Sequence, residues 1–98
     1  MSNIEGFVLN LSGAKVRSAN LSSANLTRAN FSGADLTGAI LCGANFQDTI
    51  LKGTILVGAD LTDAINLTEA QLAEAVIDET TILPPHLKHL ARHSATGR

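Results

Sequence analysis

The stretch that decides the fold is LSGAK VRSAN LSSAN LTRAN FSGAD LTGAI LCGAN FQDTI LKGTI LVGAD LTDAI, residues 11–65, divided into groups of five. Every group begins with a large apolar residue. The first positions are Leu11, Val16, Leu21, Leu26, Phe31, Leu36, Leu41, Phe46, Leu51, Leu56 and Leu61. The fourth position is small, and nine of its eleven residues are alanine. A period of five therefore dominates the chain.

Neither a helix nor a flat strand accommodates this period. In a helix, successive first positions would lie about 140° apart around the axis. In a strand they would alternate between the two faces. A chain that turns a corner after every group keeps them all inside, and four corners close a square coil of about twenty residues that stacks on the next at roughly 4.8 Å. We expect the eleven first positions to form the structural core, and the coil to be right-handed like other parallel crossovers.

The pattern resembles the pentapeptide-repeat family, whose motif is Ala-(Asp/Asn)-Leu-x-x. The matching segments are Ala19-Asn20-Leu21, Ala24-Asn25-Leu26, Ala29-Asn30-Phe31, Ala34-Asp35-Leu36, Ala44-Asn45-Phe46 and Ala59-Asp60-Leu61. The resemblance implies an all-β fold, a right-handed quadrilateral β-helix, here a solenoid of three to four coils. The family has no common enzymatic activity, and a few members bind DNA gyrase by imitating DNA.

Ninety-eight residues indicate one domain, residues 1–98. Within it we distinguish an N-terminal edge (1–10), the regular repeats (11–65) and a capping segment (66–98). In the N-terminal edge, Phe7, Val8 and Leu9 are predicted either to cover the open end of the solenoid or to stack end to end against a second molecule.

The capping segment is predicted to be partly helical. Thr68 and Gln71 form a capping box in front of a short helix at 69–75. Pro84-Pro85 precedes a second helical stretch, His86 to His93. We expect this short helical C-terminal cap to shield the last coil, as solenoids require for solubility.

The residue before each first position is predicted to face outward. It is polar in the first half of the repeats, and isoleucine at Ile40, Ile50, Ile55 and Ile65, which fall on four different faces. Ile50 and Ile55 lie on adjacent faces with Val57 nearby. With Phe7, these three residues form a possible contact surface. Scattered apolar surface residues are normal, so an incidental or intramolecular role is favoured.

Candidate chemistry is sparse. His86, His89 and His93 would fall within about 60° of one another on a helix, and three imidazoles suit zinc. No carboxylate of the tail is clearly placed to orient them, so a solvated helix face is favoured and no metal or cofactor is predicted. Cys42 is a lone outward thiol, which excludes an internal disulfide. The outward Asp35, Asp48, Asp60 and Asp63 have no predicted cleft, so no enzyme is predicted.

Charge and composition bear on the partner class. Residues 11–65 carry four acids and four bases, whereas a duplex carries one negative charge per roughly 1.7 Å. A DNA-mimicking gyrase-binding protein is therefore disfavoured. With no basic stripe, Trp or Tyr, direct nucleic-acid binding is disfavoured too.

No membrane-length apolar run or signal peptide is present, which suggests the cytoplasm. The sequence thus predicts a non-catalytic structural or protein-interaction module with an unknown protein partner. The alternatives are the gyrase-binding mimic and metal binding at the tail histidines.

Overall fold

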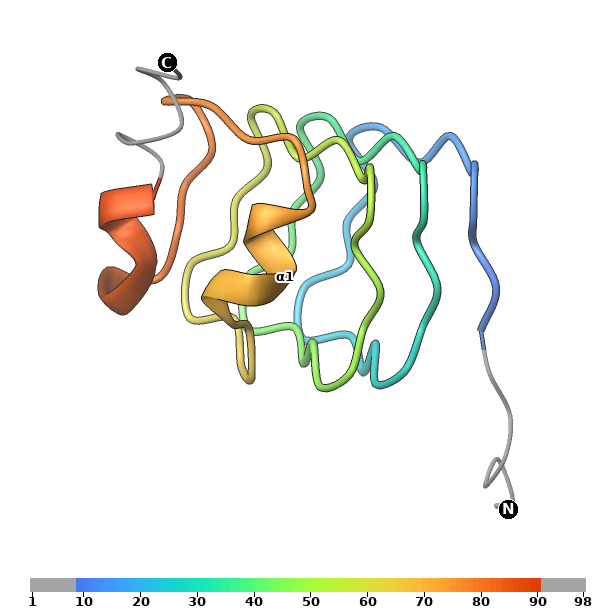
Figure 1. Ribbon diagram of the computed structural model, residues 1–98, viewed down its shortest axis with the longest axis horizontal. Helices are drawn as coiled ribbons and strands as arrows, with labels where there is room; N and C mark the ends of the chain where they lie inside the picture. Colours follow the sequence, from blue (N-terminus) through green and yellow to red (C-terminus); the bar gives the residue numbers. More distant parts are fainter. Residues whose placement is uncertain (1–8, 91–98) are drawn as a thin grey trace.

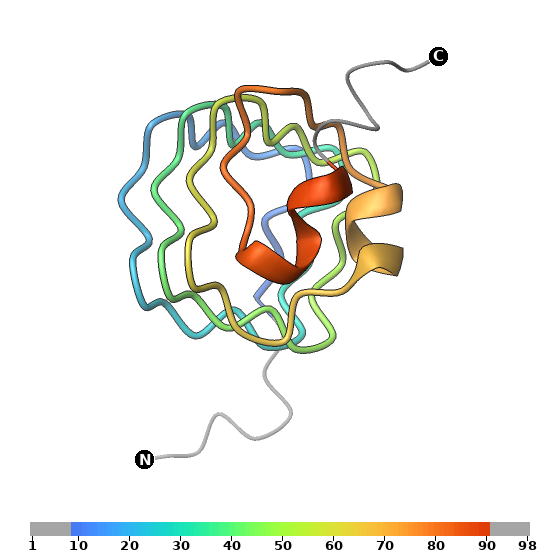
Figure 2. The same ribbon diagram turned by 90° about the vertical axis from the view of Figure 1, so that its left-hand side faces the viewer.

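The computed structural model describes residues 9–90, in which the chain winds as a stack of coils with the C-terminal segment at one end (Figure 1). The N-terminal edge residue Phe7 and the last histidine, His93, lie outside the described residues. Figure 2 looks along the stack and shows that the coils superimpose on a common outline. The molecule is 25 × 22 Å across its two shorter axes. Among residues 9–90, no helix has the length and apolarity needed to cross a bilayer.

Each coil is joined to the next by parallel bridges between residues twenty positions apart. One such column is Asn20, Ile40 and Asp60; another is Asn10, Asn30 and Ile50. The backbone repeats one bonding pattern in every column: the Leu21 amide donates to the Ile40 carbonyl at 2.7 Å, and the Ile40 amide donates to Ala19 at 2.8 Å. Because each face contributes a single bridging residue, the coils form a ladder of short contacts rather than long strands.

The third position of every group forms the corner. All eleven corner residues have a positive φ, from 57° at Asp48 to 73° at Gly58. Six are glycine, which adopts this conformation without a Cβ penalty. Ser18, Ser23, Arg28, Asp48 and Asp63 adopt it as well, so the stacking of coils overrides the local preference of these residues.

The large first-position side chains fill the centre of the stack. From the second coil on they are fully enclosed: Phe31, Leu36, Leu41, Phe46, Leu56 and Leu61 are 0% exposed, and Leu51 is 1% exposed. In the first coil, Leu26 is buried at 3% exposure, but Leu11, Val16 and Leu21 are only partly buried. The end of the stack nearest residue 9 therefore leaves part of its core accessible.

Two threonines replace the inward alanines without leaving a polar atom unpaired. The Thr49 hydroxyl donates to the Leu26 carbonyl at 2.7 Å, and the Thr54 hydroxyl donates to Phe31 at the same distance. Both side chains are buried. Each hydroxyl thus adds a hydrogen bond to the preceding coil, which compensates for its burial.

The C-terminal segment, residues 66–90, packs against the other end of the stack. Helix α1 (Glu69–Ala73) begins at a capping box formed by Thr68 and Gln71, and ends two residues before the predicted limit of 75. The Gln71 side chain also donates to the carbonyls of Phe46 and Thr49. The chain returns to the ladder at Val76 and Ile82, which bridge Ile55 and Asp60.

The segment then forms the 3-10 helix η1 (Pro85–Leu87), followed by helical residues 88–90. Figure 2 shows this last helical stretch lying across the end of the coil outline. Leu72, Leu83 and Leu87 are 2–3% exposed and belong to the same hydrophobic cluster as the coils. The two ends of the described stack therefore differ, because only one has apolar residues packed over its core.

The enclosed phenylalanines give a first prediction. Phe31→Ala or Phe46→Ala should cost about 3–5 kcal/mol, since each would leave a large cavity. Ser22→Ala, at an exposed position, should cost under about 0.5 kcal/mol. Urea unfolding measures all three variants, and similar midpoints would contradict the proposed core.

The corner conformation gives a second prediction. A Cβ added to Gly33 would meet no atom within 4 Å, so only the φ of +68° opposes a side chain there. Gly33→Ala should cost about 1 kcal/mol, because a left-handed conformation costs roughly 1–2 kcal/mol and a stiffer unfolded chain offsets part of it. Arg28→Ala is the matched control: its φ is already +62°, so the urea midpoint should barely change. A midpoint for Gly33→Ala equal to that of the unmodified protein would show that the corner is not strained.

Candidate functional site

The outward bridging positions are the most regular feature of the surface. Where the residue is Asn or Asp, its side-chain oxygen usually accepts from the amide two residues later. Asn20 Oδ1, for example, accepts from the Ser22 amide at 3.1 Å and from the Ser22 hydroxyl at 2.7 Å. The same motif recurs at Asn10, Asn25, Asn30, Asp35, Asn45 and Asp60. These polar side chains therefore stabilise the corner that follows them.

The carboxylates at these positions are held in their ionised form by the corner. Hydrogen bonds from the Thr37 hydroxyl and amide lower the pKa of Asp35, and those from Thr62 lower the pKa of Asp60. Asp35 also lies 3.7 Å from Arg17 of the preceding coil. A carboxylate that accepts these hydrogen bonds and has a lowered pKa suits a structural role better than general acid catalysis.

Isoleucine interrupts this polar series in the later coils. Ile40, Ile50 and Ile65 are 40%, 44% and 50% exposed, and Ile55 is partly buried. None has an oxygen to accept from the amide two residues later. These positions therefore exchange a corner hydrogen bond for exposed apolar surface.

Val76 and Ile82 extend the exposed apolar surface, and the sequence reasoning missed both. Each is 48% exposed. Val76 continues the column of Ile55, and Ile82 continues that of Ile40 and Asp60. They follow their partners by 21 and 22 residues instead of twenty, because α1 lies between Ile65 and Val76 and because Val76 and Ile82 are six residues apart instead of five. Extending the five-residue period could not predict these two positions, although the capping-box residues Thr68 and Gln71 marked where the period ends.

Of the predicted contact surface, Ile50, Ile55 and Val57 lie on these later coils, while Phe7 is outside the described residues.

Cys42 lies beside Asp60 on the outward side of its coil. The hydrogen bond to the Asp60 carboxylate, with partial burial, raises the pKa of the thiol. A thiol with a raised pKa is protonated at neutral pH and is a poor nucleophile. The residue thus acts as a hydrogen-bond donor to Asp60.

The tail histidines are only partly within the described residues. His86 and His89 are exposed, and His89 Nε2 lies 3.3 Å from Glu69 of α1. The expectation that no carboxylate is placed to orient a tail histidine is therefore wrong for His89, since the carboxylate comes from the other helix. Among residues 9–90, no cluster of three or more potential ligands can hold a metal ion. With His93 outside that range, the three-histidine site stays a prediction.

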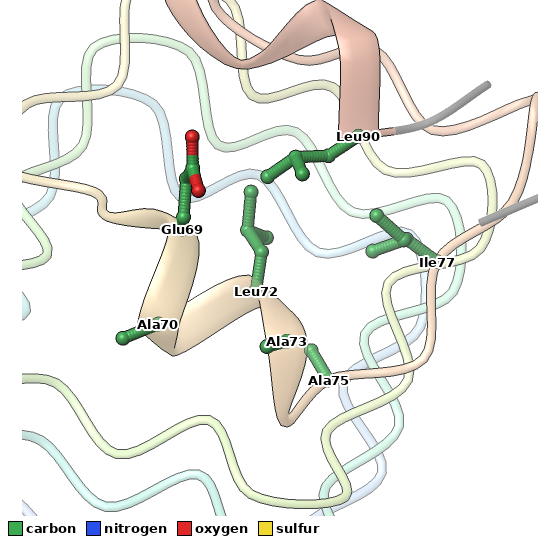
Figure 3. A pocket seen from close by; sticks show the side chains of 7 residues that line it. All are labelled: Glu69, Ala70, Leu72, Ala73, Ala75, Ile77 and Leu90. Atoms are coloured by element: carbon green, nitrogen blue, oxygen red, sulfur yellow. The ribbon is translucent and has the colours of Figure 1, made fainter. Parts of the chain in front are cut away.

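Two grooves flank helix α1. The larger, about 640 Å³, is lined by apolar side chains of α1 and of the residues after it, with Glu69 at its edge (Figure 3). Leu72, Ile77 and Leu90 approach one another across it. The smaller, about 440 Å³, includes Asp48, so the expectation that no outward aspartate lies in a concave site is wrong for that residue. Neither groove is lined by a nucleophile paired with a base.

The zero net charge of residues 11–65 conceals a strong segregation. Residues 9–29 contain Lys15, Arg17 and Arg28 and no acid, whereas residues 30–90 contain eight acids and two lysines. The rod therefore has a basic first coil and acidic later coils. Residues 11–65 are neutral as a whole, but the first coil and the later coils each carry a net charge.

Comparisons with known proteins agree with this architecture. The family model described as pentapeptide repeats matches residues 10–41, 29–65 and 43–80, with eight copies. The chain therefore belongs to the pentapeptide-repeat family, which confirms the resemblance seen in its motifs. Members of the family fold as a right-handed quadrilateral β-helix, and they are generally non-enzymatic structural or interaction proteins.

One solved structure similar to this chain is a pentapeptide repeat protein from Nostoc Pcc 7120, determined at 1.7 Å. It is 31% identical, with 83% of this chain and 70% of that chain covered and a TM-score of 0.41. No curated protein matches the chain.

Proposed function

We propose that this chain is a non-catalytic protein-interaction module that binds its partner through an isoleucine surface, defined as Ile50, Ile55, Val57 and Val76. The observation that carries the proposal is the replacement of corner-stabilising Asn or Asp by exposed isoleucine in the later coils. Ile55 and Val76 are bridge partners, so their side chains lie next to each other along one face. Ile50 occupies the preceding face.

Stability of the free chain gives little preference for these isoleucines. Each replacement gives up at least one hydrogen bond, a loss of about 0.5–1.5 kcal/mol. The β-propensity of isoleucine returns less than about 1 kcal/mol. Burial against a partner would add roughly 25 cal/mol for each Å² of apolar surface removed from water. Replacing the corner hydrogen bond by an isoleucine side chain is therefore favourable in a complex.

The scaffold suits this role because it is stiff. We infer that three to four coils, closed at one end by the C-terminal segment as a helical cap, hold the isoleucine surface in place. The buried Leu72, Leu83 and Leu87 support this reading of the segment, as does the Gln71 side chain bonded to two coil carbonyls. A preorganised surface loses little conformational entropy when it binds.

The polar groups support a binding role over a catalytic one. Asp35 and Asp60 serve as corner acceptors, and the raised pKa of Cys42 disfavours nucleophilic chemistry. A cytoplasmic location is part of the same proposal and rests on the single unpaired cysteine, which needs no oxidising compartment.

Restoring the family residue at two positions tests the isoleucine surface. The double variant Ile50→Asn, Ile55→Asn should change the free energy of unfolding by less than about 1 kcal/mol, since a new corner hydrogen bond offsets lost β-propensity at each site. The same variant should recover a partner at least tenfold less well in affinity capture from the source cell, quantified by mass spectrometry.

The control for this experiment is Asn20→Ser, which alters an outward position of the first coil and keeps a side-chain acceptor. It should recover the partner as well as the unmodified chain does. Equal capture by the double variant and the control would refute the isoleucine surface as the binding site.

The alternative function, a DNA-mimicking gyrase-binding protein, is favoured by one observation, the acid excess of residues 30–90. The basic first coil and the isoleucines between the acids oppose it. A DNA-supercoiling assay separates the two functions. We expect gyrase activity to be unchanged at tens of micromolar protein; concentration-dependent inhibition, weakened by salt, would favour the mimic.

A further inference from the structure

The N-terminal end of the described stack is incompletely buried. Leu11, Val16 and Leu21 are partly exposed, although their counterparts one coil later, Phe31, Leu36 and Leu41, are 0% exposed. The inward alanines follow the same trend: Ala14, Ala19 and Ala24 are partly exposed, and Ala34, Ala39 and Ala44 are fully enclosed. Among residues 9–90, no side chains form a layer over the core at this end.

The same end carries a row of backbone groups that have no partner among residues 9–90. In the second coil, the amides of Asp35, Ile40 and Asn45 donate to the coil before them. The equivalent amides of Lys15, Asn20 and Asn25 have no partner among residues 9–90. The carbonyls of Lys15 and Asn20 are likewise unpaired in that range, whereas those of Asp35 and Ile40 accept bonds. Donors and acceptors alternate along the edge, as they do on an open sheet edge that templates strand addition.

We infer that this N-terminal end is a homodimer interface, in which the first coils of two copies pair edge to edge in antiparallel fashion about a two-fold axis. A two-fold axis across the stack reverses the chain direction, so donors of one copy face acceptors of the other. At the opposite end of the rod, residues 85–90 lie across the outline of the coils (Figure 2). This interface is separate from the isoleucine surface and does not depend on the proposed function.

The area of the N-terminal end indicates a weak dimer. A cross-section of 25 × 22 Å gives an end face of at most about 550 Å² for each copy. The total of at most about 1,100 Å² is close to the roughly 1,000 Å² that specific interfaces need. The dimer is therefore weak and concentration-dependent, with dissociation expected in the micromolar to millimolar range.

Charge modulates the same interface. Lys15, Arg17 and Arg28 surround the end without an acid among residues 9–29, and within residues 9–90 the salt bridge of this group is that of Arg17 with Asp35. In a two-fold dimer these cations face those of the second copy. Salt screens such repulsion, so raising the salt concentration from 50 to 500 mM should strengthen the dimer. A head-to-tail contact, between the basic first coil of one copy and the acidic later coils of another, would instead become weaker as the salt concentration rises.

A proline at the edge tests the interface directly. Lys15→Pro removes an edge amide that bonds nothing among residues 9–90, and its ring prevents close pairing there. Lys15→Ala removes the same charge but keeps the amide. In analytical ultracentrifugation from 1 µM to 1 mM, the unmodified chain and Lys15→Ala should shift from monomer to dimer. Lys15→Pro should stay monomeric, with an unchanged circular dichroism spectrum and urea midpoint.

Hydrogen exchange provides a measurement that requires no variant. The amides of residues 15, 20 and 25 should become protected as the concentration of the unmodified protein rises. The inference is overturned by a strict monomer, by masses that grow beyond the dimer, or by a folded Lys15→Pro that still dimerises. It is also overturned if these three amides are protected equally at all concentrations, since another segment of the same chain would then cover the edge.

Discussion

The structure depends on one constraint: residues twenty positions apart must lie above one another so that the backbone of each coil can bond to the next. The bonds from Leu21 to Ile40 and from Leu41 to Asp60, 2.7 and 2.8 Å long, belong to the same repeated pattern. That pattern fixes the corner conformation even where the residue resists it, as at Arg28 with a φ of +62°. It also aligns the large side chains into columns, and enclosing them supplies the main apolar stabilisation.

The end coils of a stacked fold have a neighbour on one side only, so their core residues and backbone groups need other partners. The two ends of this stack differ in how these partners are supplied. At the C-terminal end, α1 and residues 85–90 place Leu72, Leu83 and Leu87 against the last coils, and the Gln71 side chain donates to the carbonyls of Phe46 and Thr49. At the N-terminal end, Leu11 and Val16 are partly exposed and the edge amides are unpaired within residues 9–90. The interior is uniform because every coil has two neighbours, so the distinctive surfaces arise at the ends and where isoleucine replaces Asn or Asp.

Much of this arrangement could be predicted from sequence because the period of five leaves few geometric solutions. The inward first positions, the corner residues and the four faces of Ile40, Ile50, Ile55 and Ile65 all follow from counting. Counting failed where α1 interrupts the period, so Val76 and Ile82 were missed as continuations of the apolar columns. The contact between His89 and Glu69 and the groove beside Asp48 were missed for a related reason, since both depend on how the C-terminal segment folds back on the coils. No local pattern specifies that packing.

The most direct test of the stacked-coil account is to measure hydrogen-bond scalar couplings by NMR on isotope-labelled protein. The account predicts couplings from the amide nitrogen of Leu21 to the carbonyl carbon of Ile40 and from Leu41 to Asp60, together with slow exchange of both amides. Couplings to residues four positions earlier would indicate a helix. The absence of any long-range coupling, with both amides exchanging freely, would show that the coils do not stack with a twenty-residue repeat.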